Sequence, residues 1–275
     1  MRFGVTRASG HLGRLVTAGL ATAVDPREVV LITRTPDVLH PQPGTTVRLG
    51  DFSRTETLDH AFTEIETLLL ISTDTVGLRL EQQRAAIAAA ARAGVGRILY
   101  TSVPNPVAGN PAFVVPDHAG TEAALRESGM QWTALRNNLY AHMQLPVIQR
   151  AAATGRLVSS QGEGRAAYVT REDCAAVAVA AMLQSGHENH AYDVTGPAAL
   201  GAADLAVMAG DRVEVVPVSD DEYAAGLVAA KLPEPLARGL ASFGAGIRDG
   251  YFAEVTNVVQ DLTGRPAASL ATLLA

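Results

Sequence analysis

Hydrophobic residues in the first half of the chain alternate between short continuous runs and longer stretches with helical spacing. The short runs predict β-strands at residues 3–6, 29–33, 46–49, 68–71, 97–101 and 132–135. Helical periodicity between them covers residues 12–20, 56–62 and 79–93. Strands that are apolar along their whole length are typical of parallel sheets covered on both faces. The repeated strand–helix order therefore predicts an α/β fold, a Rossmann-like doubly wound parallel sheet.

The second half of the chain is less regular. Thr170 is a predicted N-cap ahead of an alanine- and valine-rich helix that runs to Leu183. Further predicted elements are a strand at residues 213–218 and helices at 220–231 and 234–240. No Ser/Gly linker or break in composition divides the chain. We therefore expect a single NAD(P)-binding type of domain over residues 1–275, in which residues of about 140–275 add a small C-terminal lobe on the substrate side.

Composition excludes several classes of protein. Hydrophobic residues make up 48% of the chain, as in globular proteins, and the net charge of −6 offers no basic surface for nucleic acid. The single cysteine, Cys174, excludes an internal disulfide, and His187 and His190 lack further metal ligands nearby. No apolar run reaches the roughly 18 residues of a membrane span. We expect a cytoplasmic protein with no metal site.

A glycine-containing loop follows the first predicted strand and opens the first predicted helix. Gly10 and Gly13 occupy the second and third positions of a G-x-x-G-x-x-G spacing, whereas Arg7 stands at the first. Backbone N–H groups at such a helix start bind dinucleotide pyrophosphate, and glycines leave room for the approach. The two glycines alone also fit an ordinary strand–helix turn. The strand before them and the helix after them favour a cofactor loop.

Two arginines bear on the choice and affinity of the cofactor. Arg34 follows the second strand, about 20 residues beyond the loop, where a ribose-recognising residue is expected. An arginine there favours the 2′-phosphate of NADP over the ribose hydroxyl of NAD. Arg7 allows two interpretations, since it either adds a contact to a cofactor phosphate or weakens cofactor binding by replacing a glycine.

Motifs spread along the chain carry a family resemblance. They lie at residues 5–13, 69–73, 100–102, 117–118, 121–122, 135–140, 170–173 and 262–266. In order and spacing they resemble the NmrA-like atypical short-chain dehydrogenases, and among these the type 2 NAD(P)H:quinone oxidoreductases. The resemblance implies a Rossmann domain that binds NADPH along the carboxyl ends of its strands.

The resemblance also assigns expected roles to individual residues. Gly10, His11 and Leu12 would contact the pyrophosphate, and Arg34 the 2′-phosphate. Ser72, Thr73 and Asp74 would flank the adenosine-side ribose and phosphates, while Thr101, Ser102 and residues 137–140 would surround the nicotinamide. The full expected cofactor set is Thr6, Arg7, Ser9, Gly10, His11, Leu12, Arg34, Ser72, Thr73, Asp74, Thr101, Ser102, Asn137 and Asn138.

The chain lacks the Tyr-x-x-x-Lys pair of ordinary short-chain dehydrogenases. Its one lysine is Lys231, and Leu227 stands four residues before it. A substrate that accepts hydride readily, such as a quinone, needs less proton donation, so catalysis would rest on positioning. The expected catalytic residues are Tyr140, Asn137 and His118. The alternatives are that His118 is a solvent-exposed histidine at a helix start and Tyr140 a half-buried tyrosine at a strand end.

The resulting hypothesis is an NADPH-dependent reductase of a quinone or similar activated carbonyl, acting on a small molecule. Two alternatives stay open. One is a redox-sensing regulator that binds NAD(P) without turnover, and the other is a reductase of a specialised ketone or imine in a biosynthetic pathway. The sequence also leaves open whether the protein forms a homodimer, and whether Phe243, Tyr251 and Phe252 line a pocket or the core.

Overall fold

The computed structural model describes residues 1–75 and 77–274, and a parallel seven-stranded sheet forms its centre. The strands lie in the order β3-β2-β1-β4-β5-β6-β8. Successive strands are added outward from β1 to β3 on one side and from β4 to β8 on the other, so the switch point of the parallel sheet lies between β1 and β4. Their bounds are β1 (Phe3–Val5), β2 (Val29–Thr33), β3 (Thr46–Leu49), β4 (Thr67–Leu70), β5 (Arg97–Ser102), β6 (Gln131–Asn137) and β8 (His190–Val194). This order is the Rossmann arrangement, so the predicted fold class is confirmed.

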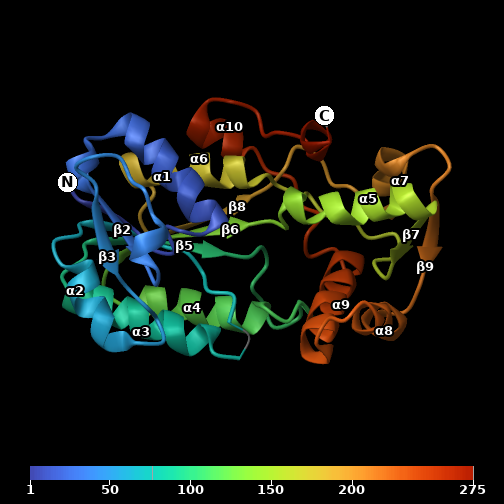
Figure 1. Cartoon of the computed structure of the whole chain (residues 1–275), viewed down its shortest axis with the longest axis horizontal. Helices are drawn as coiled ribbons and strands as arrows, with labels where there is room; N and C mark the ends of the chain where they lie inside the picture. Colours follow the sequence, from blue (N-terminus) through green and yellow to red (C-terminus); the bar gives the residue numbers. More distant parts are fainter. Residues whose placement is uncertain (76, 275) are drawn as a thin grey trace.

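Helices cover both faces of this sheet (Figure 1). One face carries α1 (His11–Ala23), α6 (Arg171–Leu183) and α10 (Val258–Thr263), and the other carries α2 (Leu58–Phe62), α3 (Arg79–Arg92) and α4 (Val115–Glu127). Alternate residues of each strand point to opposite faces. Val5, Leu31 and Leu69 therefore pack beneath α1 and α6, whereas Ile32 and Leu70 pack toward α2 and α3.

A smaller lobe lies beyond the carboxyl ends of the strands, at the right of Figure 1. It contains α5 (Leu145–Thr154), β7 (Arg156–Ser159), α7 (Ala202–Ala209), β9 (Glu214–Pro217), α8 (Asp220–Ala229) and α9 (Glu234–Arg248). Strands β7 and β9 form a separate parallel pair. The intervening elements α6 and β8 return to the large sheet, as does α10 later in the chain. The small lobe is therefore discontinuous within residues 140–275.

Several elements differ from the expectations. Helix α9 extends to Arg248 rather than ending at residue 240, although Gly244 and Gly246 disfavour a helix. Both glycines lie in close contact with other segments, and a Cβ on Gly246 would approach the Phe252 ring to 2.8 Å. Tight packing thus outweighs intrinsic propensity at these positions. Thr170 caps α6 as predicted, with its hydroxyl accepting a hydrogen bond from the backbone N–H of Asp173.

The remaining short helices are 3₁₀ segments at residues 26–28, 36–38, 55–57, 141–143 and 270–273. Within residues 1–75 and 77–274, the structure contains no helix with the length and apolar character needed to cross a membrane.

Candidate functional site

The loop between β1 and α1 takes the shape that its glycine spacing predicts. Arg7 adopts a left-handed backbone conformation with φ of +49°, and its carbonyl accepts a hydrogen bond from the Gly10 N–H at 2.8 Å. A Cβ on Gly13 would collide with that carbonyl, so glycine is required for α1 to start this close to the loop. Gly10 is the N-cap and has no side chain. The first N–H groups of α1 therefore point outward without a side-chain cap.

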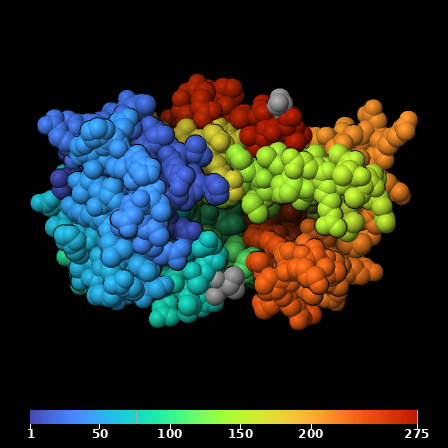
Figure 2. All heavy atoms as spheres, viewed as in Figure 1, coloured from blue at the N-terminus to red at the C-terminus, as the bar shows by residue number. Residues whose placement is uncertain are grey.

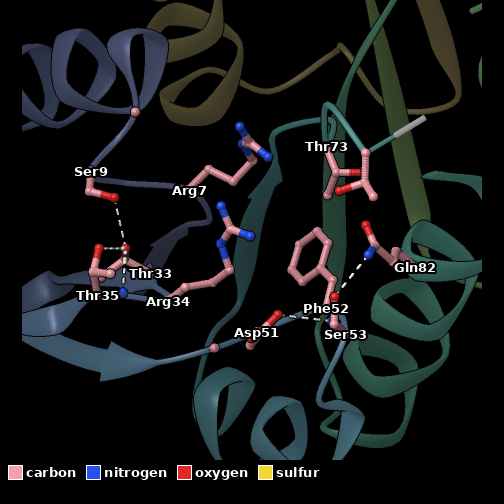
Figure 3. Close-up of a pocket in the computed structure, with 13 residues that line it drawn as sticks. Arg7, Ser9, Thr33, Arg34, Thr35, Asp51, Phe52, Ser53, Thr73 and Gln82 are labelled. Carbon is pink, nitrogen blue, oxygen red and sulfur yellow. Dashed lines mark hydrogen bonds between the residues drawn. The ribbon is translucent and has the colours of Figure 1, made fainter. Parts of the chain in front are cut away.

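Two pockets lie against this loop. The first, here called the loop pocket, has a volume of about 430 Å³ and lies beside the ends of β2 and β3. It is lined by Arg7, Ser9, Gly10, Thr33, Arg34, Thr35, Gly50, Asp51, Phe52, Ser53, Thr73, Thr75 and Gln82. Figure 3 shows the side chains of Arg7 and Arg34 extending into the same space, with Thr73 across from them. Arg34 is exposed and has no ion-pair partner within the described part of the chain.

Strand ends hold the loop pocket in shape. The Ser9 and Thr33 hydroxyls lie 2.8 Å apart, and the Ala8 N–H donates to the Ile32 carbonyl at 3.1 Å. These bonds fasten the glycine loop to the end of β2. On the opposite wall, Gln82 donates to the Ser53 hydroxyl at 2.9 Å.

The second pocket, here called the lobe pocket, has a volume of about 770 Å³ and lies between the large sheet and the small lobe. Figure 2 shows this side of the molecule hollowed between the two parts. Polar residues come from the loop and the strand ends and, within the small lobe, from Ser159, Ser160 and Gln161, whereas apolar residues come mainly from the small lobe. The apolar lining includes Val103, Val114, Leu139, Val147, Leu157, Leu205, Leu227, Leu240, Phe243 and Ile247. Of this group, the sequence pointed only to Leu139, within residues 137–140, and to Phe243, since apolar residues on separated helices carry no motif.

Nearly all the expected site residues line these two pockets. Ser9, Arg34 and Thr73 belong to the loop pocket. Those on the lobe pocket are His11, Leu12, Ser72, Asp74, Thr101, Ser102, His118, Asn137, Asn138 and Tyr140. Only Arg7 and Gly10, among the residues that the structure describes, line both.

Thr6 departs from the expectation. It is fully buried and lines neither pocket of the described chain. Its hydroxyl donates to the Leu69 carbonyl at 3.1 Å and accepts from the Ile71 N–H at 2.9 Å. Because both interactions join the end of β1 to the end of β4, the Thr6 side chain holds these strands together beneath the two pockets.

Two asparagines at the end of β6 differ in whether their side chains keep a hydrogen-bonding group free for a ligand. Asn138 donates to the Phe252 carbonyl at 3.0 Å and accepts from the Leu139 N–H at 2.7 Å, so it is engaged within the protein. Asn137 donates at 3.4 Å to the Tyr140 hydroxyl, and its buried Oδ1 has no hydrogen-bond partner within the described residues. A buried polar atom without a partner is costly, so this oxygen is ready for a donor from a ligand.

Tyr140 follows Asn137 along the same wall. Burial raises the pKa of its hydroxyl, so the tyrosine stays protonated at neutral pH. The guanidinium carbon of Arg171 lies 5.2 Å from the centre of its ring. This cation–π contact restrains the ring at the edge of the lobe pocket. Tyr140 thus offers a neutral hydroxyl and no tyrosinate.

His118 lies in the first turns of α4 and is buried, so its interpretation as a solvent-exposed histidine is wrong. Its Nδ1 lies 2.7 Å from the Tyr100 hydroxyl. Burial, with a smaller effect of the nearby Arg79 charge, lowers the pKa of His118 to about 3. The imidazole is therefore neutral at neutral pH and does not act as an imidazolium acid.

A buried carboxylate holds Ser102 in place. The Ser102 hydroxyl donates to Glu122 at 2.8 Å, and Arg136 donates to both Glu122 oxygens at 2.9 Å. Arg126 is a second cation on this carboxylate and donates to its Oε2 at 2.8 Å. Burial alone would raise the pKa of Glu122, but the hydrogen bonds from Arg136 and Ser102 and the charges of both arginines lower it overall. The sequence motif contained Glu122, yet nothing in it marked Arg126 or Arg136 as its partners.

Comparisons with known proteins match this geometry. A family described as NAD(P)H-binding matches residues 8–185. The chain belongs to this NAD(P)H-binding family. Quinone oxidoreductase 2 of Escherichia coli is 34% identical over 274 residues, with 97% of this chain and 95% of that protein covered. A solved NADPH-dependent quinone oxidoreductase from Escherichia coli, complexed with NADPH, superposes with a TM-score of 0.94 at 33% identity, covering 99% of this chain and 98% of that chain.

A further relative shows how widely the substrates of the NAD(P)H-binding family vary. It is the (4-alkanoyl-5-oxo-2,5-dihydrofuran-3-yl)methyl phosphate reductase of Streptomyces griseus, 32% identical over 268 residues, with 96% of this chain and 93% of that protein covered. The matches confirm the expected resemblance to the type 2 quinone oxidoreductases.

The residues present fit a dinucleotide of the kind that this NAD(P)H-binding family binds. Arg34 offers an unpaired cation, and the uncapped start of α1 offers N–H groups suited to phosphate. The buried Thr73 Oγ1 in the loop pocket and Asn137 Oδ1 in the lobe pocket both lack partners among the described residues. Each pocket therefore contains a buried polar atom that has no partner among the described residues, and the two atoms lie at the two ends that a dinucleotide would occupy.

Proposed function

We propose that this protein is an NADPH-dependent oxidoreductase that transfers hydride to a quinone or a similar activated carbonyl compound. The observation that carries the proposal is the junction at Arg7 and Gly10, where a polar pocket containing Arg34 meets a larger apolar one. The polar pocket suits the phosphate-bearing adenosine end of the cofactor. The apolar pocket has room for a nicotinamide and a ring-shaped acceptor.

The lobe pocket supplies residues that position the reacting groups. When bound, the reduced nicotinamide supplies the hydride for the acceptor. Asn137 Oδ1 would accept a hydrogen bond from the carboxamide N–H, which gives this buried oxygen its missing partner. Ser102 already donates its proton to Glu122, so its oxygen is left to act as an acceptor. These contacts fix the orientation of the nicotinamide ring, which is how a site without a strong acid promotes hydride transfer.

Proton transfer requires less from the protein than orientation of the nicotinamide ring does. A quinone that gains hydride becomes a hydroquinone anion, a stable product that takes its proton from water. The neutral His118 and the Tyr140 hydroxyl, both on the lobe pocket, would stabilise the developing charge by donating hydrogen bonds. With orientation supplied by one set of residues and hydrogen bonds to the developing charge by another, the site would not need the tyrosine–lysine pair.

The redox-sensing alternative has less support. A sensor needs the dinucleotide site but not a second, apolar space beside the nicotinamide end, whereas the lobe pocket is the larger of the two. The relatives reported above are also named for reductase activity.

Steady-state assays test the proposal. Purified protein mixed with NADPH and a series of benzoquinones and naphthoquinones should lower the absorbance at 340 nm faster than a protein-free blank. Asn137→Ala should slow this reaction while the thermal midpoint changes little. Binding of NADPH without turnover on any of the quinones would contradict the reductase and support the sensor.

A further inference from the structure

Arg7 is the residue at which this chain leaves the glycine pattern of its loop. Its backbone nevertheless takes the left-handed conformation, φ +49°, that a glycine adopts without strain. The loop therefore keeps its shape and gains a long cationic side chain. That side chain crosses to the segment after β4, where its Nη1 lies 3.0 Å from the Asp74 carboxylate.

The Arg7–Asp74 pair lies where the two pockets meet. Arg7 lines both pockets, and Asp74 lines the lobe pocket. The Arg7 side chain is only 28% exposed, whereas that of Asp74 is 79% exposed. The hydrogen bond from Arg7 lowers the pKa of Asp74, with a smaller contribution from the charge of Arg34. Asp74 is thus ionised, and its ion pair holds the Arg7 side chain across the junction of the two pockets.

A dinucleotide that occupies both pockets must pass its central pyrophosphate through this junction. The junction also lies at the start of α1, where Gly10 contributes an uncapped helix end. We propose that Arg7 is a pyrophosphate-binding residue, positioned by Asp74, at the place where the G-x-x-G-x-x-G spacing has its first glycine. The inference rests on the proposed function, since it needs the cofactor to bind across both pockets. It resolves the two interpretations of Arg7 in favour of a ligand contact.

Comparing NADPH with NADH provides the test, because the two share the pyrophosphate and differ only in the 2′-phosphate. Both are titrated by calorimetry into the wild type, Arg7→Ala and Arg34→Ala. Loss of a charge-assisted hydrogen bond weakens binding by about tenfold to a hundredfold. Arg7→Ala should weaken NADPH and NADH by similar factors. Arg34→Ala, the matched control, should weaken NADPH and leave NADH nearly unchanged.

A second substitution separates the charge from the backbone. Arg7→Gly removes the same guanidinium but relieves the left-handed conformation, so its thermal midpoint should exceed that of Arg7→Ala. Both variants should lose affinity for the two dinucleotides alike. In the wild type, higher salt should weaken binding more steeply than in either variant.

Several results would overturn the inference. Tighter binding by Arg7→Ala and Arg7→Gly would show that Arg7 obstructs the site, and unchanged binding would show that it is only a surface ion pair. Weakening of NADPH alone would move Arg7 to the 2′-phosphate. If the wild type bound neither dinucleotide, the proposed function itself would fail, which the wild-type titration reveals before any variant is measured.

Discussion

The two pockets on either side of the glycine loop are built in contrasting ways. The loop pocket is formed by the ends of neighbouring strands and the segments that follow them, and most of the residues that line it are polar. The lobe pocket is assembled across the gap between the sheet and helices α8 and α9, and much of its lining is apolar. Local backbone geometry therefore determines the first pocket, whereas packing between distant parts of the chain determines the second. The first suits a fixed cofactor and the second a variable substrate.

The largest expected effect concerns the buried charges that support the lobe pocket. Glu122→Ala leaves Arg136 and Arg126 without their shared carboxylate and frees the Ser102 hydroxyl. The free energy of unfolding should fall by about 3 kcal/mol, at the lower end for a broken buried pair because both arginines stay partly exposed. Chemical denaturation measures it. Glu127→Ala, on the exposed side of the same helix, should change it by less than about 0.5 kcal/mol.

The next effect concerns the loop pocket. Gly13→Ala places a methyl group against the Arg7 carbonyl and the Ala8 Cα, so α1 must move away from the loop. We expect a loss of about 2 kcal/mol in stability together with weaker NADPH binding. Gly226→Ala is the control, because a Cβ there meets nothing within 4 Å and the residue lies inside α8. That change should raise the thermal midpoint slightly. Equal behaviour of the two variants would argue against a tightly specified loop.

A smaller effect should affect the substrate alone. Leu240→Ala removes apolar surface from the α9 wall of the lobe pocket. The KM for a quinone should rise by up to about tenfold, as expected for a shortened side chain in a hydrophobic site. The Kd for NADPH should stay the same. Leu236→Ala, one turn earlier on α9 and outside the described pockets, should leave both constants unaltered. A change in NADPH affinity with Leu240→Ala would mean that the two pockets are not separable.

The smallest expected effect is a flat pH profile. Because burial lowers the pKa of His118 to about 3, its imidazole stays neutral throughout the range from pH 5 to 8. Protonation would begin only well below that range. The rate of hydride transfer should therefore show no inflection near pH 6.5, where an exposed histidine titrates. An inflection there that disappears in His118→Gln would contradict the neutral role assigned to His118.

The sequence predicted the strands and the loop pocket at their ends well, and it predicted the apolar wall of the lobe pocket poorly. The strands β1 to β6 were predicted to within two residues at each end, because each contains a short run rich in apolar and β-branched residues between helical or turn segments. Strand β8 was missed, since His190 and Asp193 interrupt its pattern and only pairing with β6 makes it a strand. Residues of the loop pocket follow recognisable strand ends. The apolar wall of the lobe pocket, such as Leu227 and Leu240, depends on helix packing that no local pattern records.

The candidate site showed the same limit in its finer details. Motifs identified His118 and Glu122. Their protonation, however, depends on burial and on partners from other segments of the chain, Tyr100 beside His118 and Arg136 beside Glu122. Thr6 stood in the motif and turned out to join two strands. Spacing thus located the residues, whereas their chemical state required the three-dimensional structure.

The discontinuity of the small lobe constrains how this protein can change over evolution. After β6 the chain builds α5 and β7, returns to the large sheet as α6 and β8, and leaves again for α7 to α9 before α10. The lobe therefore cannot be exchanged as a single cassette, because cutting out α5 to α9 would also remove the edge strand β8 and the covering helix α6. New substrate preferences must instead arise through point substitutions and short insertions within α5 and α7 to α9, while the cofactor half stays intact.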